Sequence, residues 1–429
     1  MSDNSEVSST GVNIGRIVAL FGGVILITSG VRFTYFGLLL ATIMPVTGVI
    51  LAIVGMLSGV GVLLGILTYP RWNVTSIVLI IISSIWGIFV STGIFLGPIL
   101  GVGGGIILLL SKRMSIGKRK LITLFLTILI LILPLLGIIR SQSEDFQYIM
   151  VGDTKRQYLI HIPESYNGSD AVPLLLALHG GGGSAKSMRN ANGFDAVADK
   201  YNFILVYPDG TGDMSYQFHT WNSGYIDAYA FKNNIDDVLF LSTLIDELLD
   251  TYNVNKSRVY MTGHSNGAMM TYRFGAEHPD SLAAIAPVSG SIGGRMSEES
   301  NLYVIPSPSE PLSVIHIHGR LDEQVLYEGG KGEKGFLTDR VDLSVNDSIQ
   351  FWINHNNCSN SPSLEKSDNE RIELARFGSG EKNTEVALIT LLYGSHAWSN
   401  MSAEIALEEF YATSLAELIW IQVSQYSRV

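Results

Sequence analysis

Ser265 has the surroundings of a catalytic nucleophile. It stands in the pentapeptide Gly263-His264-Ser265-Asn266-Gly267, which fits the pattern G-x-S-x-G. Residues 259–262 before it are predicted to form a short buried strand, and a helix is predicted to begin near Ala268. Small flanking residues let the strand and the helix approach closely, and the helix N-terminus favours negative charge beside the serine. The stretch predicts a nucleophile elbow, a turn suited to acyl transfer through Ser265.

Two more residues complete a Ser-His-Asp arrangement. Asp322 follows a predicted strand at 314–318, within HGRLDEQV, and His396 follows the last predicted strand at 387–393, within LLYGSHAWSN. A carboxylate can orient a histidine, and that histidine can take the proton of a serine. The order Ser, Asp, His along the chain is the order found in α/β-hydrolases. We therefore predict Ser265, Asp322 and His396 as the catalytic residues.

Other histidines compete with His396, and an acidic turn competes with the catalytic interpretation of Asp322. Glu323 lies next to Asp322, so the pair could be a solvated turn. We expect the remaining histidines to be structural: His179, His264, His278, His316, His318 and His355.

A glycine-rich segment precedes the elbow by about one strand–helix unit. Residues 179–183 read His-Gly-Gly-Gly-Gly and directly follow an apolar stretch at 172–178. Glycines let backbone N–H groups approach a substrate oxygen, so Gly180 and Gly181, together with the N–H of Asn266, are predicted to form an oxyanion hole. The alternative is a flexible loop without such a role.

Strands and helices alternate along residues 141–429, which predicts a doubly wound, mostly parallel sheet. Together with the order Ser, Asp, His, this sheet fits the α/β-hydrolase class. A hairpin is expected first, at 146–151 and 157–162, followed by strands at 172–178, 203–207, 259–262, 282–288, 314–318 and 387–393. Helices are expected at 194–201, 235–252, 344–355 and 402–422. In such sheets sites form at the carboxyl ends of the strands, and the predicted site residues all follow strands.

Some residues allow two interpretations. Asp236 and Asp237 begin a predicted helix, where acidic side chains interact favourably with the helix dipole. Trp221 and Trp398 fit either a pocket wall or a packed core. The segments 323–343 and 359–384 could shape a substrate pocket.

Charge is distributed very unevenly along the 429 residues. Residues 1–140 hold two acidic and nine basic side chains, whereas residues 141–429 hold 37 acidic and 19 basic ones. The acidic balance of the second part makes nucleic acid a poor partner. A single cysteine, Cys358, excludes an intrachain disulfide and a metal site built from several thiolates.

The first part resembles a membrane block. Residues 17–31, 33–70, 72–111 and 121–139 contain no charged side chain, and a bilayer span needs about 20 apolar residues. We expect roughly five spans in residues 1–140, with two or three of them in the first 70 residues. A cleaved signal peptide at 16–31 is the alternative for the first stretch, but it leaves the later ones unexplained.

The basic loop before the last predicted span sets the expected orientation. Five basic residues lie between 112 and 120, and such loops stay in the cytoplasm. We expect a multi-pass protein of the cell membrane, in contact with the lipid bilayer, whose domain 141–429 faces the extracytoplasmic side.

Residues 150–400 resemble a family of secreted esterases that includes polyhydroxybutyrate depolymerases, feruloyl esterases and acetylxylan esterases. The matching stretches include LLLALHGGGG at 174–183, TWNSG at 220–224, NKSRVYMTGHSNGAMM at 255–270, HIHGRLDEQVLYEGG at 316–330 and GSHAW at 394–398. The resemblance implies a serine esterase with Ser265 as nucleophile, Asp322 as acid and His396 as base. Two departures are Ala268, where members often have a second glycine, and Cys358, which has no partner cysteine.

The expected reaction is hydrolysis of a carboxylic ester through an acyl-enzyme, which needs no metal and no organic cofactor. Two alternatives stay open at this point. One is a serine peptidase on the same fold, and the other is a membrane-anchored binding or sensing module with an inactive hydrolase domain.

Overall fold

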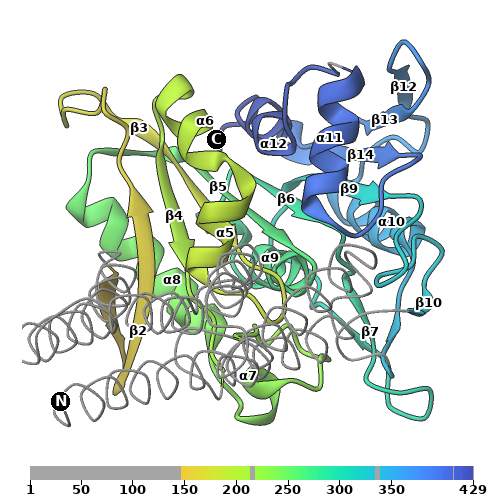
Figure 1. Cartoon of the computed structure of the whole chain (residues 1–429), viewed down its shortest axis with the longest axis horizontal. Coiled ribbons are helices and arrows are strands. Elements are labelled where there is room, and N and C mark those ends of the chain that lie inside the picture. Colours follow the sequence, from red (N-terminus) through yellow and green to blue (C-terminus); the bar gives the residue numbers. More distant parts are fainter. Residues whose placement is uncertain (1–145, 213–217, 334–338, 409, 429) are drawn as a thin grey trace, which may run out of the picture. The chain divides into compact units, whose positions relative to one another are not determined.

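A computed structural model describes residues 146–212, 218–333, 339–408 and 410–428, which Figure 1 draws in colour. The chain divides into two units, and the second comprises Asp145–Val429. The transmembrane block expected at residues 1–140 lies outside the described residues. Within the described ranges, no helix has both the length and the apolar character needed to cross a bilayer.

A ten-stranded sheet forms the centre of the second unit, in the order β1-β2-β4-β3-β5-β6-β9-β14-β13-β12 (Figure 1). Its central strands are parallel: β4 (Ile204–Pro208), β3 (Val172–Leu178), β5 (Val254–His264), β6 (Ala284–Val288), β9 (Ser313–Gly319) and β14 (Val386–Leu391). Antiparallel strands form both edges: β1 (Gln147–Val151), β2 (Thr154–His161), β13 (Ile372–Phe377) and β12 (Ser363–Lys366). The predicted α/β-hydrolase sheet and its opening hairpin are confirmed.

Helices cover both faces of the sheet, and the side chains of each central strand are therefore divided between two cores. In β3 every residue is buried; Leu174 and Leu176 belong to one core, whereas Leu175 and Ala177 belong to the other. This alternation follows from the two-residue period of a strand. A strand covered on both faces needs apolar residues at successive positions, which explains the uninterrupted apolar stretch.

The helices divide into two layers (Figure 1). The first layer contains α8 (Asp237–Thr251), α9 (Asn266–Glu277) and α10 (Val345–Asn356), and the second contains α5 (Ala185–Asn192), α6 (Phe194–Tyr201), α11 (Trp398–Glu408) and α12 (Leu415–Val423). Ser184 and Ser344 begin α5 and α10 with side-chain hydrogen bonds that close a capping box, which satisfies N–H groups of the first turn. A short helix, α7 (Tyr229–Lys232), precedes α8.

The expectation of one helix at 402–422 was wrong, because two helices, α11 and α12, occupy this region. Tyr411 between them has a φ of 61°, which a right-handed helix does not allow. Ser414 then begins α12 by accepting a hydrogen bond from the N–H of Glu417. Both helices pack on the same core, so buried apolar residues occur on both sides of the break.

The segments expected to shape a pocket contain strands. Residues 359–384 contain β12 and β13, which extend the main sheet at its edge beside β14. Residues 323–343 contribute β10 (Gly330–Lys331) and β11 (Val341–Asp342) to a second, four-stranded sheet with β7 (Gly293–Arg295) and β8 (Tyr303–Val304).

A buried ion pair joins the edge strand β2 to the start of α8. The guanidinium of Arg156 lies 2.7 Å from Asp237 Oδ1, and the other carboxylate oxygen accepts the N–H of Asn222 at 2.8 Å. Asp236 caps α8 by accepting the N–H of Leu239, so its predicted place at the start of a helix is confirmed. Asp237 also lies in the first turn, but its buried carboxylate mainly bonds residues outside the helix.

We predict that Arg156→Met lowers the free energy of unfolding by about 3–5 kcal/mol, because Asp237 is left buried without its cation. Urea denaturation followed by tryptophan fluorescence measures the change. The exposed pair Lys232–Asp227 supplies the control, because Lys232→Met removes an ion pair that water already screens. Equal losses of unfolding free energy in the two variants would show that burial does not make the Arg156–Asp237 pair more important than the exposed pair.

Candidate active site

The elbow between β5 and α9 places Ser265 in a strained backbone conformation. Its φ of 55° and ψ of −119° are unusual for a residue with a Cβ. The Ser265 N–H donates to the carbonyl of Val288 at 2.9 Å, which ties the turn to the neighbouring strand β6. The elbow predicted for this pentapeptide is thus present.

Both glycines of the elbow lie where no side chain fits. A Cβ on Gly263 would lie 2.4 Å from the carbonyl oxygen of Gly267. A Cβ on Gly267 would lie 2.4 Å from the carbonyl oxygen of His179. These distances are far below van der Waals contact, so the strand, the helix and the glycine-rich loop meet at Ser265 backbone to backbone.

Ala268, the departure from the family pattern, has a compensating partner. A Cβ on Gly290, which follows β6, would lie 2.6 Å from the Cβ of Ala268. The space that a second glycine would leave empty in the elbow is therefore filled by the Ala268 methyl group, and Gly290 accommodates it.

Asp322 and His396 form a direct pair at the carboxyl ends of the adjacent strands β9 and β14. The distance between His396 Nδ1 and Asp322 Oδ2 is 2.7 Å. The other carboxylate oxygen, Oδ1, accepts the N–H groups of Gln324 and Val325 at 2.8 and 2.9 Å. These bonds leave the carboxylate little freedom to rotate.

The charge of Asp322 is stabilised by its partners. Burial alone would raise its pKa, but the charge of His396 and the hydrogen bonds from His318 and His396 hold the pKa well below its usual range. An ionised carboxylate accepts the Nδ1–H of His396, which leaves Nε2 of that histidine as the atom able to take a proton.

His264 links the elbow to the loop that carries His396. Its Nε2 lies 2.8 Å from the carbonyl oxygen of His396, so that nitrogen must donate its proton. The rings of His264 and His396 are 4.8 Å apart, and Trp398 presents its ring edge-on at 5.9 Å. His264 therefore has the structural role expected of it. It holds the backbone of His396, the candidate base, and it directly precedes Ser265 in the sequence.

Ser265 and His396 both follow the carboxyl ends of their strands, β5 and β14. Among the described residues, no hydrogen bond joins the Ser265 hydroxyl to His396. Catalytic hydrogen bonds are often long in enzymes without substrate and shorten when the reacting complex forms. The geometry therefore brings the three predicted catalytic residues to one sheet edge, and their catalytic roles remain a prediction.

The glycine-rich loop presents two unbonded amides to this edge. Gly182 and Gly183 donate to the carbonyl oxygens of His219 and Gly180, at 2.9 and 3.0 Å. Within the described part of the chain, the N–H groups of Gly180 and Gly181 donate no hydrogen bond. A Cβ on Gly180 would lie 3.6 Å from that of Ser265, so this amide pair borders the elbow.

The segment TWNSG holds the loop and the elbow together. Trp221 Nε1 donates to the carbonyl oxygen of His179 at 2.9 Å. The backbone N–H of Trp221 donates to the side chain of Asn266 at 2.8 Å, and the Asn266 amide donates back to the carbonyl of Trp221 at 3.1 Å. Trp221 is fully buried, so the packed-core interpretation holds. Its bracing role could not be read from the sequence.

A cluster of His179, Asp209 and His219 has the composition of a metal site, with candidate ligand atoms within 4.8 Å of one another. Its atoms are already engaged in hydrogen bonds. His179 Nε2 accepts the N–H of Gly210 at 3.0 Å, and Asp209 Oδ1 lies 2.9 Å from His219 Nδ1 and accepts the N–H of Ala185 at 3.0 Å. Burial lowers the pKa of His179 to about 4, which keeps the ring neutral. The cluster thus fits a network that supports the glycine-rich loop.

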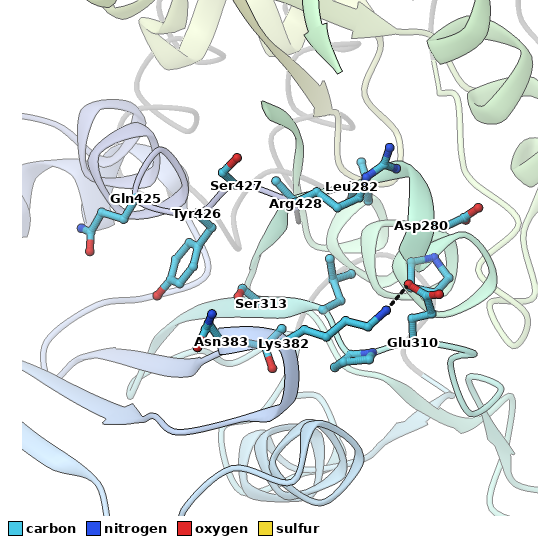
Figure 2. A pocket seen from close by; sticks show the side chains of 15 residues that line it. Asp280, Leu282, Glu310, Ser313, Lys382, Asn383, Gln425, Tyr426, Ser427 and Arg428 are labelled. Carbon is cyan, nitrogen blue, oxygen red and sulfur yellow. Dashed lines mark hydrogen bonds and ion pairs between the residues drawn. The ribbon is translucent and has the colours of Figure 1, made fainter. Parts of the chain in front are cut away.

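A cavity of about 610 Å³ lies at the opposite edge of the sheet, near the amino ends of β6, β9 and β14 (Figure 2). Its lining includes Leu282, Ser313 and Asn383, and an ion pair of 3.0 Å between Lys382 and Glu310 spans one side. Ser265, Asp322 and His396 follow the carboxyl ends of their strands, so the cavity is separate from the candidate active site.

The comparisons with known proteins agree with this fold. Residues 166–361, slightly under half of the chain, match the family model described as Phospholipase/Carboxylesterase. A bifunctional acetylxylan esterase/xylanase of Neocallimastix patriciarum is 29% identical over 40% of this chain. Feruloyl esterase B of Piromyces equi is 25% identical over 56% of it, and acetylxylan esterase A of Emericella nidulans is 30% identical over 38%.

The alignments cover only part of each relative: 22% of the Neocallimastix protein, 42% of the Piromyces protein and 50% of the Emericella protein. The expected resemblance of this unit to acetylxylan and feruloyl esterases is nevertheless confirmed. The described unit has the α/β-hydrolase fold, and its sequence is similar to that of carboxylic ester hydrolases.

We predict that His264 makes the protein less stable in acid. Burial, followed by the charge of His396, lowers the folded-state pKa of His264 to about 3. The unfolded chain then binds more protons as the pH falls below the ordinary histidine pKa of about 6.5, so stability is lost on acidification. Between pH 7 and pH 5 this loss amounts to about 2 kcal/mol.

Urea denaturation at pH 7, 6 and 5 tests this assignment with His264→Gln, which keeps an amide donor for the His396 carbonyl but binds no proton. The variant should lose less stability between pH 7 and pH 5 than the wild type does. His355→Gln, at a partly exposed histidine, serves as the control and should leave the pH dependence unchanged. If the free energy of unfolding of His264→Gln changed with pH as steeply as that of the wild type, the assignment would be contradicted.

Proposed function

We propose that residues 141–429 are a serine esterase that hydrolyses carboxylic esters through an acyl-enzyme. The observation that carries the proposal is the combination at one sheet edge of a strained Ser265 and the Asp322–His396 pair, with His396 Nδ1 2.7 Å from the carboxylate. The similarity to acetylxylan and feruloyl esterases supports the same reaction class.

In the first half of the reaction, His396 Nε2 takes the hydroxyl proton of Ser265 while the serine oxygen attacks the ester carbonyl carbon. Asp322 remains ionised and stabilises the imidazolium that forms on His396. The carbonyl oxygen becomes an oxyanion, and we expect it to accept hydrogen bonds from the N–H groups of Asn266, Gly180 and Gly181. Collapse of the intermediate expels the alcohol, which takes the proton from His396.

In the second half, His396 removes a proton from a water molecule, and the resulting oxygen attacks the acyl-enzyme. The same amides receive the second oxyanion. Its collapse releases the carboxylic acid and returns the proton to Ser265. His396 Nε2 carries out every proton transfer, because the Asp322 carboxylate keeps the other ring proton on Nδ1.

The substrate class we propose is an uncharged ester with an acetyl or hydroxycinnamoyl acyl group, such as those found on plant polysaccharides. The names of the relatives support the acyl groups. Residues 141–429 carry 37 acidic against 19 basic side chains, which disfavours strongly anionic substrates. Esters of 3-hydroxybutyrate are the second uncharged class to test.

Ser265→Ala should lower the hydrolysis rate by roughly 10⁶-fold, because no other group replaces the nucleophile. Suitable substrates are nitrophenyl acetate, methyl ferulate, acetylated xylan and oligomeric 3-hydroxybutyrate, with a nitroanilide to measure amide hydrolysis. Ser242→Ala, at a serine of α8, is the matched control and should keep the wild-type rate. Full turnover by Ser265→Ala would refute the nucleophile.

A labelled fluorophosphonate separates an enzyme from an inactive hydrolase domain, because only an activated serine reacts with it. The wild type should become labelled, and Ser265→Ala should not. Absence of labelling in folded wild-type protein would favour the binding or sensing module.

We also propose that residues 1–140 anchor the protein in the cell membrane, with residues 141–429 on the extracytoplasmic side. The uncharged stretches of spanning length and the basic loop at 112–120 support this topology. The full chain should stay with membranes after an alkaline wash, and protease added outside intact cells should remove the hydrolase unit. Release by the wash, or complete protection from the protease, would refute the topology.

A further inference from the structure

A chain of buried hydrogen bonds connects α9 to His318, which lies beside the carboxylate of Asp322. The hydroxyl of Tyr272 lies 2.7 Å from His316 Nδ1, and His316 Nε2 lies 3.0 Å from His318 Nδ1. His318 Nε2 lies 2.8 Å from the carbonyl oxygen of Val325 and 3.4 Å from Asp322 Oδ2. Tyr272, His316 and His318 have no exposed surface. The reaction described above uses none of these three side chains.

The acceptor at the end of the chain determines where every proton lies. A carbonyl oxygen can only accept, so His318 Nε2 carries a proton and donates it to Val325. A neutral His318 then has only Nδ1 as an acceptor, and the facing Nε2 of His316 must donate. This leaves His316 Nδ1 as the acceptor for the hydroxyl proton of Tyr272.

Reversing this order would leave a buried group without a partner. A second proton on His318 would sit at Nδ1 and would need His316 Nε2 as its acceptor. The His316 proton would then lie on Nδ1, facing the Tyr272 hydroxyl, whose own proton has no other acceptor among the described residues. Burial also lowers the pKa of His316 well below its usual range, which opposes any extra charge in the chain.

We propose that Tyr272, His316 and His318 are positioning residues for Asp322. Their hydrogen bonds keep His318 neutral, so that it serves Asp322 as an uncharged hydrogen-bond donor. The proposal rests on the role assigned to Asp322 in ester hydrolysis. His318 limits the rotation of the carboxylate together with the two backbone amides on Oδ1, and it does so without adding a positive charge.

The neutrality of His318 matters because of the groups around it. His316 contacts it on β9, and Asp322 and Tyr327 contact it from the segment after β9. His264 at the end of β5 interacts with it electrostatically. A cationic His318 would compete with His396 for the negative charge of Asp322. It would also repel the imidazolium that forms on His396 during the reaction, and the rate would fall.

The test uses Tyr272→Phe, which removes the hydroxyl and keeps the ring that stacks on His316 at 5.8 Å. Without that hydroxyl, His316 is free to reverse its tautomer and His318 can take a second proton. We expect ¹⁵N NMR at pH 7 to show His318 protonated at Nε2 alone in the wild type, because that nitrogen donates to Val325, and to show an altered protonation of the His316–His318 pair in the variant.

The same variant should show a kcat for nitrophenyl acetate that falls more steeply with acid than the wild-type kcat does, with KM unchanged. Tyr260→Phe is the matched control, because it removes a tyrosine hydroxyl that donates to the carbonyl of Tyr426 and contacts no histidine. It should leave the histidine spectra and the pH profile unchanged. A loss of stability alone in Tyr272→Phe, with wild-type spectra and pH profile, would overturn the proposal.

Two substitutions at His318 keep the test decisive if Tyr272→Phe does not fold. His318→Gln retains an amide donor near the Nε2 position and cannot become charged, so its kcat should stay close to the wild-type value at every pH. His318→Leu provides no donor, and its kcat should fall at least tenfold with little change in KM. Equal kcat values for the two variants would refute the positioning role.

The NMR measurement needs no substrate, so it distinguishes failure of this proposal from failure of the proposed function. A wild type that hydrolyses esters but holds a charged or Nδ1-protonated His318 would refute the positioning chain. A wild type with the expected spectra that neither hydrolyses esters nor reacts with a fluorophosphonate would refute the function and retain the proton arrangement.

Discussion

The close approach of three backbone segments at Ser265 is the constraint on which the rest of the site depends. A Cβ on Gly267 would meet the carbonyl oxygens of His179 and Leu178, at 2.4 and 2.6 Å, and a Cβ on Gly263 would meet that of Gly267. The absence of both side chains allows the serine to leave β5 at a φ of 55° and to begin α9 directly. It also brings the amides of the glycine-rich loop beside the serine. Any side chain at these two positions would push the strand, the helix and the glycine-rich loop apart.

Neutral histidines surround this contact and hold it without adding charge. Burial keeps the pKa of His179 near 4 and that of His264 near 3, so each ring has one donor and one acceptor at neutral pH. His179 supports the glycine-rich loop through Gly210, and His264 holds the carbonyl of His396. These two histidines therefore add no positive charge beside Asp322, whose carboxylate contacts His396.

The bracing side chains come from distant parts of the sequence and act as one unit. Trp221 joins the His179 carbonyl to the side chain of Asn266, while Arg156 and Asp237 fix the turn that contains Asn222 to β2 and α8. This arrangement gives the TWNSG segment a physical role, because it connects the amides of the loop with the first residue of α9. Hydrogen bonds between side chains and backbone thus connect the glycine-rich loop, the start of α9 and the edge strand β2.

The sequence by itself determined the fold class, the segments that form the central strands and the candidate catalytic residues. Apolar periodicity and the residues that follow each strand are local properties of the chain. Gly263, Ser265 and Gly267 could be recognised within five residues. The chain from Tyr272 through His316 to His318 could not, although two histidines within an otherwise apolar strand were a visible signal. Only the tertiary structure decided these partners, the break between α11 and α12 and the role of Trp221. Hydrogen bonds between side chains far apart in sequence depend on which strands and helices become neighbours, and local pattern does not specify that.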